Sequence, residues 1–187
     1  MTETKPRLRA APLWTTSGPW LNTPKGEPLA LADLRGRVVV ALGFQMLCPG
    51  CVGHALPQLA RVRRAFHPAR VAVVGLHTVF EHHAANTPET LAAFAHEYRL
   101  DFPIGIDATD PRGGRTPVTM AAYAMQGTPT LLLIDAEGRL RRQNFGHVED
   151  IALGAEIALL VAEAGGAPAG PSDVAASAAA HGRCAIP

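Results

Sequence analysis

Two cysteines at close spacing form the most reactive motif in the sequence. Cys48 and Cys51 enclose only Pro49 and Gly50. The motif follows an apolar run and opens an amphipathic segment, which predicts a position between a strand and the N-terminus of a helix. Free amides and the dipole at such a terminus favour the thiolate, which is the reactive form of cysteine. We therefore expect Cys48, at the exposed helix start, to be the nucleophile, and Cys51 to attack the mixed disulfide that Cys48 forms.

A zinc or haem site would need ligands that this motif lacks. A four-cysteine zinc site requires a second pair of cysteines, and the remaining one, Cys184, lies far along the chain. The haem attachment motif would need a histidine at Val52. Redox chemistry is therefore favoured over metal binding, and Cys184 is kept as a candidate third redox partner.

The elements around the motif alternate between strand and helix. An apolar run over residues 37–44 predicts a buried strand, and residues 70–77 predict a second one after the intervening helix. Such a short strand–helix–strand order implies parallel strands joined by a right-handed crossover, so both strands should end at the same edge of the sheet. Pro57 should kink the helix, because it donates no amide hydrogen and its ring clashes with the preceding turn.

The remaining elements complete one domain over residues 12–164. Patterning predicts helices over 87–98, 118–125 and 149–164, an extended segment over 102–106, and a hairpin formed by 131–135 and 140–145. Residues 1–11 are expected to be a flexible N-terminus. Ala, Gly, Pro and Ser make up 17 of the 23 residues from 165 to 187, so this tail is expected to be disordered.

Composition excludes several classes of partner. The chain has 187 residues, with 17 Lys and Arg against 16 Asp and Glu, so it lacks the basic excess of a nucleic-acid-binding protein. Its longest apolar runs fall short of the roughly 20 residues that cross a bilayer, and its first residues do not form a secretory signal. We expect a cytoplasmic protein that binds neither membrane nor nucleic acid; its oligomeric state is left open.

The order of these elements, with Cys48 and Cys51 upstream of Gly127-Thr-Pro-Thr130, resembles the thioredoxin fold. The closest resemblance is to its TlpA-like and peroxiredoxin-like (AhpC/TSA-type) branch, and the segments that carry it are Leu31–Val40, Phe102–Asp107, Tyr123–Thr130 and Leu132–Gly138. The resemblance implies an α/β fold with a central mixed β-sheet flanked by helices. It also implies a thiol–disulfide oxidoreductase that needs no cofactor and acts on protein or small-molecule disulfides and thiols.

The resemblance further implies a cis peptide bond between Thr128 and Pro129, which would shape the groove that docks a partner beside the two sulfurs. The chain departs from the family at three positions. Leu47 replaces the usual Trp before the first cysteine, and Pro57 stands six residues after Cys51 where five is usual. His54 occupies the position where many TlpA-like members carry Glu. These departures leave the redox potential and the partner open.

A thiol-dependent peroxidase is the first alternative. Peroxiredoxins activate their cysteine with the motif Pro-x-x-x-Thr/Ser-x-x-Cys. If Cys51 were that cysteine, Phe44 and Cys48 would occupy the Pro and Thr/Ser positions. If Cys48 were that cysteine, Ala41 and Gln45 would occupy them. The motif fails in both registers.

A metal-binding protein is the second alternative, and it depends on a histidine-rich segment after the second strand. His77, Glu81, His82 and His83 should lie at the sheet edge where the two parallel strands end, close to the cysteines. They could hold a metal together with Cys48 and Cys51, move protons, or simply form a polar loop. His54 is similarly either a base for the thiols or an exposed helix residue.

Overall fold

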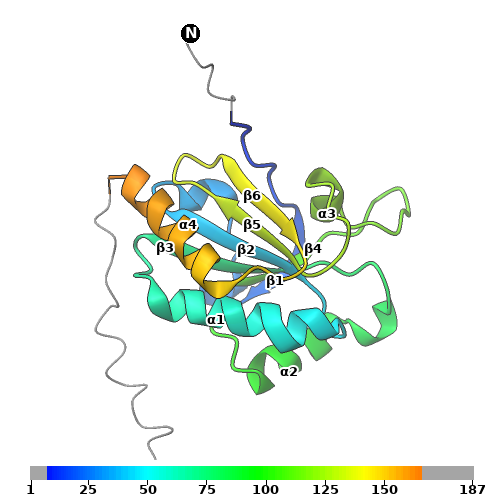
Figure 1. Cartoon of the computed structure of the whole chain (residues 1–187). Coiled ribbons are helices and arrows are strands. Elements are labelled where there is room, and N and C mark those ends of the chain that lie inside the picture. Colours follow the sequence, from blue (N-terminus) through cyan, green and yellow to red (C-terminus); the bar gives the residue numbers. More distant parts are fainter. Residues whose placement is uncertain (1–7, 166–187) are drawn as a thin grey trace, which may run out of the picture.

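The computed structural model describes residues 8–165, which form a single six-stranded sheet with helices on both faces (Figure 1). The strands are β1 (Thr16–Leu21), β2 (Val38–Phe44), β3 (Val71–His77), β4 (Ile104–Asp107), β5 (Thr130–Ile134) and β6 (Leu140–Phe145). The α-helices are α1 (Leu56–Ala65), α2 (Pro88–Glu97), α3 (Val118–Ala122) and α4 (Asp150–Glu163). Four shorter turns are η1 (Pro24–Gly26), η2 (Leu31–Leu34), η3 (Cys51–Ala55) and η4 (His83–Ala85).

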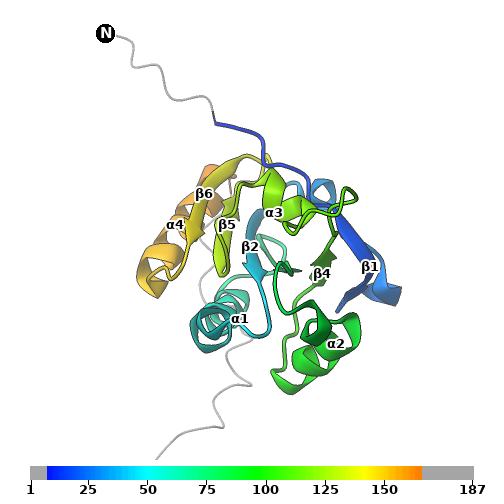
Figure 2. The ribbon, with the colours of Figure 1, turned by 90° about the vertical axis from the view of Figure 1, so that its right-hand side faces the viewer.

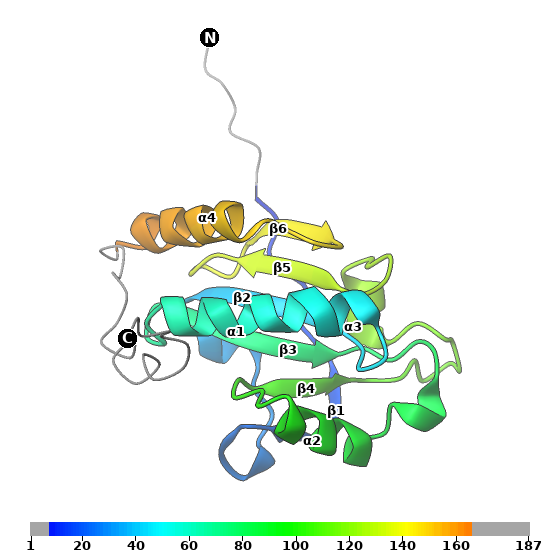
Figure 3. The same cartoon turned by 60° about the horizontal axis from the view of Figure 1, so that its bottom comes forward.

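The sheet is mixed, and its strand order is β1-β4-β3-β2-β5-β6 (Figure 3). Central strand β2 runs parallel to β3, with Phe44 beside His77 at their common end. The parallel pairing expected from the strand–helix–strand order is therefore confirmed. On its other side β2 pairs antiparallel with β5, and Gly43 lies beside Thr130. This register brings the segment before β5 to the same sheet edge at which β2 and β3 end.

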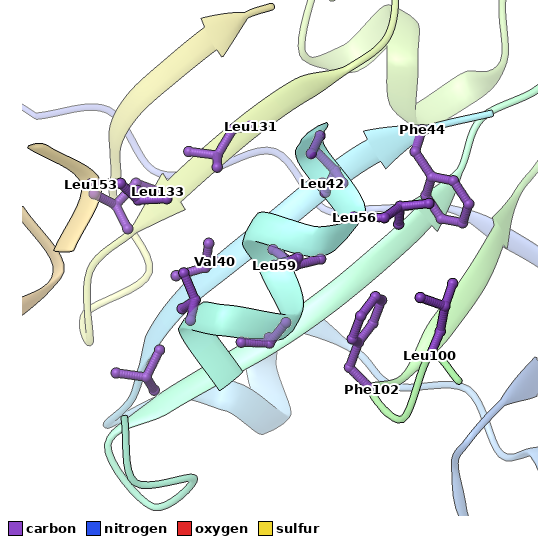
Figure 4. Close-up of a cluster of buried hydrophobic side chains, with 14 of the residues drawn as sticks. Val40, Leu42, Phe44, Leu56, Leu59, Leu100, Phe102, Leu131, Leu133 and Leu153 are labelled. Carbon is purple, nitrogen blue, oxygen red and sulfur yellow. The ribbon is translucent and has the colours of Figure 1, made fainter. Parts of the chain in front are cut away.

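Two apolar layers hold the sheet between the helices. Helices α1, α2 and α4 cover one face, while α3 and the N-terminal segment lie on the other (Figure 2). Alternate residues of β2 point into different layers: Val40 and Leu42 face α1, whereas Val39 and Ala41 face the opposite side. Figure 4 shows the first layer, in which Leu56 of α1 lies near Phe44. Burial on both faces explains why β2 and β3 are continuous apolar runs rather than alternating ones.

The predicted effect of Pro57 takes the form of a π-helical turn. Residues Cys51–Ala55 are π-helical, and the Leu56 N–H donates to the Cys51 carbonyl, five residues back, rather than to that of Val52. Pro57 then falls in the first turn of α1, where a missing N–H costs little. A π-turn adds one residue to an otherwise continuous helix. It therefore accommodates the six-residue spacing between Cys51 and Pro57.

Strand β1 has no clear signal in the sequence. Its segment contains Gly18 and Pro19 and does not alternate, yet it pairs antiparallel with β4 at the edge of the sheet. Proline is tolerated on edge strands because its missing N–H need not complete a ladder. Trp20 anchors the strand by packing against Gly105, where the indole ring occupies the space that a Cβ would fill.

The structure describes part of the predicted flexible N-terminus but none of the predicted tail after residue 165. Arg9 and Ala11, in the predicted flexible terminus, form backbone hydrogen bonds with Leu140 and Gly138. Residues 1–7 and 166–187 lie outside the described residues. The predicted disorder of the tail and the candidate role of Cys184 therefore stay predictions.

Candidate functional site

Cys48 occupies the cap position of the helix, as its spacing predicts. Pro49 and Gly50 are the first helical residues, and the backbone N–H of Cys51 donates to Cys48 Sγ at 3.3 Å. A side chain that accepts from the third amide of a helix is a standard N-cap arrangement, here made with sulfur. Proline suits the first helical position because the amide there has no intrahelical partner. The free thiol of Cys48 is also partly exposed, so it combines access with a nearby backbone donor.

Cys51 lies one turn deeper and is fully buried, with 0% exposure. Burial, followed by the hydrogen bond with Cys48, raises the pKa of the Cys51 thiol to about 12. The backbone of Gln45 and the side chain of Thr128 oppose this shift by stabilising the thiolate. The two thiols are therefore close together but chemically unequal, and Cys48 is the more accessible one.

The segment before β5 supplies the second side of the site. The Thr128–Pro129 peptide bond is cis, as the resemblance implies. The carbonyl of Thr128 accepts a hydrogen bond from Cys48 Sγ at 3.4 Å. A Cβ added to Gly50 would lie 3.4 Å from Pro129 Cδ, so the helix start and the proline ring face each other closely. Cys48 and Thr128 are both partly exposed at this edge, whereas Pro129 is buried behind them.

The loop between β6 and α4 completes the surroundings of Pro129. The N–H of Gly146 donates to the Pro129 carbonyl at 2.9 Å. Next to it, the His147 ring lies 5.9 Å from the ring of His54, at a tilt of 59°. Gln58 ties this loop to α1 by donating to the carbonyl of Val148 at 2.6 Å. His54 is thus an exposed residue of the π-turn with a ring partner across the groove.

Sequence patterns do not predict that this loop belongs to the site. Gly146 and His147 lie among charged and polar residues with no periodicity, and their partners Pro129 and His54 are distant in the chain. Gln45 is similarly hidden: it is 1% exposed, and its side chain accepts from the Phe80 N–H and donates to Glu81 Oε1. Such contacts depend on tertiary packing, which short-range spacing does not reveal.

The histidine-rich segment lies at the expected edge of the sheet, but its members have different environments. His77 is buried at the end of β3, where its ring packs on Phe44 and its Nε2 lies 3.3 Å from Asn86 Oδ1. Burial lowers the pKa of His77 to about 4, although the bond with Asn86 acts in the opposite sense. His82 and His83 are exposed.

The metal-binding alternative requires several ligands to converge. Within residues 8–165, the structure has no group of three or more His, Cys, Asp or Glu side chains that could hold a metal ion. Glu81 contacts Gln45 rather than the histidines that follow it. The part of the chain that the structure describes therefore does not assemble the ligand set of this alternative.

Comparison with known proteins agrees with this geometry. The AhpC/TSA family matches residues 9–143, which is more than half of the chain. The chain belongs to the AhpC/TSA family. Protein DipZ of Mycobacterium bovis is 32% identical over 128 residues, and the same holds for DipZ of Mycobacterium tuberculosis. The match covers 68% of this chain but only 17% of DipZ, so the chain corresponds to a small part of these relatives.

Solved structures give a closer match over their whole length. A thioredoxin-like superfamily protein has 54% identity and a TM-score of 0.78, with 82% of this chain and 96% of that protein covered. A thiol-disulfide isomerase from Corynebacterium glutamicum has 44% identity and a TM-score of 0.74, covering 81% and 96% respectively. The predicted thioredoxin-like α/β fold is confirmed by these two structures.

One further expectation concerns membranes. Among residues 8–165, no helix has both the length and the apolar character needed to span a bilayer. The cytoplasmic compartment stays a prediction.

Proposed function

We propose that this protein is a dithiol–disulfide oxidoreductase in which Cys48 attacks and Cys51 resolves. The observation that carries the proposal is the unequal placement of two adjacent thiols. Cys48 caps the helix at a partly exposed position, whereas Cys51 is fully buried behind it. An external disulfide can reach Cys48 first, and only a disulfide already attached to Cys48 comes within reach of Cys51.

The reaction proceeds by two thiol–disulfide exchanges. The Cys48 thiolate attacks one sulfur of a substrate disulfide, forming a mixed disulfide and releasing the other substrate sulfur as a thiolate. Cys51 then loses its proton and attacks Cys48 Sγ, which breaks the mixed disulfide and releases the second substrate thiolate. The substrate gains two electrons, the protein is left with a Cys48–Cys51 disulfide, and an external thiol or dithiol reduces it again.

Polar groups around the sulfurs support both steps. The Cys51 N–H faces Cys48 Sγ and stabilises negative charge on it. The Gln45 backbone and the Thr128 side chain favour the thiolate of Cys51 and thereby offset part of the rise in its pKa. Thr128 and Pro129 form the wall against which we propose that an extended substrate segment docks. None of these steps calls for a cofactor.

Reduction of insulin by dithiothreitol tests the proposal. Wild-type protein should accelerate precipitation of the reduced insulin chains, and Cys48→Ser should lower the rate to that of dithiothreitol alone. His96→Ala, which changes an exposed residue of α2, is the matched control and should retain the wild-type rate. Equal rates with and without wild-type protein would disprove the proposal.

The peroxidase alternative has its own assay. Consumption of hydrogen peroxide in the presence of dithiothreitol measures it directly. Because neither cysteine register contains the peroxiredoxin motif, we expect peroxide consumption near the rate of a free thiol. Rapid turnover that depends on Cys48 or Cys51 would favour the peroxidase instead.

A further inference from the structure

Gln45 is a buried polar residue next to the reactive edge, and none of the steps above uses its side chain. It follows β2 directly, stands three residues before Cys48 and is 1% exposed. A buried amide is costly unless its polar atoms have partners, so the contacts that Gln45 makes decide its orientation. Those contacts lead in two directions, to the cysteines and to the histidine-rich segment after β3.

The main chain of Gln45 interacts with both cysteines. Its carbonyl accepts a hydrogen bond from the Cys48 N–H at 3.3 Å, which closes a turn over residues 45–48. The backbone of Gln45 also favours the Cys51 thiolate, against the burial that raises the pKa of this thiol. The orientation of this one residue therefore affects both the position of Cys48 and the charge on Cys51.

The side chain of Gln45 is held by the segment after β3, which runs from the end of that strand to α2 (Figure 3). Gln45 Oε1 accepts a hydrogen bond from the Phe80 N–H at 3.4 Å, and Nε2 donates to Glu81 Oε1 at 3.5 Å. The oxygen and the nitrogen of the amide thus each have a partner, and both partners belong to the same segment.

The segment that holds the amide is itself fixed to the rest of the fold. Thr78 Oγ1 donates to the buried carboxylate of Asp107 at 2.7 Å. Further along, the buried Asn86 amide donates to the carbonyls of Glu81 and His82 at 3.5 and 3.1 Å. The segment therefore provides a fixed support on both sides of the residues that contact the amide.

The two exchanges make different demands on the turn over residues 45–48. The attack of Cys48 on a substrate needs an accessible thiolate, and the donor beside this sulfur is the Cys51 N–H within the helix. The attack of Cys51 needs more, because a proton must leave a buried thiol and the two sulfurs must be held in line. The second exchange therefore depends more strongly on how this turn is held.

We propose that Gln45 is a positioning residue for the second exchange. Its side chain, anchored on the segment after β3, fixes the turn over residues 45–48 and thereby aligns Cys48 Sγ with Cys51. The inference rests on the proposed function and adds to it the group that sets the rate of resolution. It also gives the histidine-rich segment a role that needs no metal ion.

Separate measurement of the two exchanges tests the proposal. The substrate is a peptide whose single cysteine is linked to thionitrobenzoate, and each protein carries Cys184→Ser so that no third thiol reacts. Attack of Cys48 on the peptide sulfur releases thionitrobenzoate and leaves the peptide disulfide-bonded to Cys48. Attack of Cys51 on Cys48 Sγ then releases the peptide thiolate, and acid-quenched intact mass spectra follow the decay of this adduct.

Gln45→Met keeps the approximate length of the side chain but removes both of its hydrogen bonds. Loss of a hydrogen bond at a buried site changes a rate or an equilibrium by roughly two- to tenfold. The rate constant for decay of the adduct should therefore fall about fivefold or more, while that for thionitrobenzoate release stays within twofold of wild type. Equal slowing of the two steps, or unchanged decay of the adduct, would overturn the positioning role.

Variants of Glu81 distinguish an anchor from an effect of charge. Glu81→Gln keeps an oxygen that accepts from the Gln45 amide and should resolve the adduct within twofold of the wild-type rate. Glu81→Ala removes that acceptor and should slow resolution about threefold or more. Because Glu81 is exposed, these variants decide the outcome even if Gln45→Met folds poorly. Equal slowing in Glu81→Gln and Glu81→Ala would assign the effect to the carboxylate charge and overturn the anchor.

The same measurements separate this inference from the proposed function. The control His96→Ala should keep both wild-type rates. If wild type and Cys48→Ser release thionitrobenzoate at equal rates, or if the wild-type adduct never decays, the dithiol proposal itself fails. If both steps occur in wild type and resolution is unchanged in Gln45→Met, only the positioning role fails.

Discussion

The division of labour between Cys48 and Cys51 depends on their separate environments more than on their shared motif. Both sulfurs belong to one turn of helix, but only Cys48 is partly exposed. Burial and the neighbouring thiol raise the pKa of Cys51 to about 12, so at neutral pH very little of it is thiolate. Because iodoacetamide reacts with thiolate, the two cysteines should differ in alkylation rate.

We predict that Cys48 is alkylated at least tenfold faster than Cys51 at pH 7. The measurement uses Cys51→Ser and Cys48→Ser, each in a Cys184→Ser background so that one thiol remains, with mass spectrometry to follow the product. The rate at Cys51 should rise with pH up to the alkaline limit of the assay. Faster reaction at Cys51 than at Cys48 would reverse the assignment.

His77 illustrates how a residue identified by its type can have a structural role. The Asn86 amide donates its Nδ2 hydrogens to the carbonyls of Glu81 and His82, so its Oδ1 faces His77 Nε2 and Nε2 must carry the proton. His77 Nδ1 is buried without a hydrogen-bond partner. The ring is therefore held neutral, and the burial that does so lowers its pKa to about 4.

This lowered pKa predicts that stability falls in acid. Between about pH 6.5 and pH 4 the unfolded chain binds a proton at His77 while the folded chain does not, so the free energy of unfolding decreases as the pH falls. The full effect is on the order of 3 kcal/mol. His77→Phe removes the titrating group. From pH 7.5 to pH 4.5, the unfolding free energy of wild type should therefore fall by about 2 kcal/mol or more relative to that of this variant.

Urea unfolding at several pH values measures this difference. His96→Phe is the matched control, because His96 is exposed and its replacement should give a difference that stays nearly constant with pH. A constant difference for His77→Phe as well would show that burial does not suppress protonation of His77.

At the scale of elements, Asp107 connects two segments that the sequence presents as unrelated. Its buried carboxylate accepts hydrogen bonds from Thr78 Oγ1 at 2.7 Å and from the N–H groups of Thr119 and Met120 at 2.8 and 3.0 Å. Asp107 thus caps α3 from the end of β4 and holds the start of the histidine-rich segment. Its donors lie 12 or more residues away, which explains why local capping patterns do not identify it.

Replacing Asp107 should destabilise the fold markedly. Asp107→Ala leaves three buried donors without their acceptor, and we predict a loss of about 2–4 kcal/mol in the free energy of unfolding. Asp101→Ala, which removes an exposed carboxylate paired with Arg63, should cost less than about 1 kcal/mol. Similar losses for the two variants in urea unfolding would contradict the role given to Asp107.

The elements that form the site follow closely from the sequence, and the exceptions have physical causes. Continuous apolar runs identify β2 and β3, and Thr87 caps α2 as its side chain predicts. Strand β1 is not predicted from the sequence, because an edge strand tolerates Pro19 and needs no apolar alternation. Proline chemistry predicts a disturbance at Pro57, but whether the helix kinks or widens depends on packing against the sheet.

For the whole molecule, the decisive feature is that distant segments meet at one edge of the sheet. The ends of β2 and β3, the start of the helix and the segment before β5 all meet there. The motif of Cys48 and Cys51 and the Thr128–Pro129 pair could be predicted from their residue types and order. The contacts of the β6–α4 loop with Pro129 and α1 could not, because they depend on tertiary packing between segments that are distant in the chain.

The central claim is that Cys48 attacks and Cys51 resolves, and trapping of the mixed disulfide tests it most directly. Wild type, Cys48→Ser and Cys51→Ser, all in a Cys184→Ser background, are mixed with one equivalent of a peptide mixed disulfide, and intact masses are recorded over time. Cys51→Ser should accumulate a stable peptide adduct, wild type should end with a Cys48–Cys51 disulfide, and Cys48→Ser should stay unmodified. A stable adduct on Cys48→Ser, or an adduct on wild type that never resolves, would contradict the account.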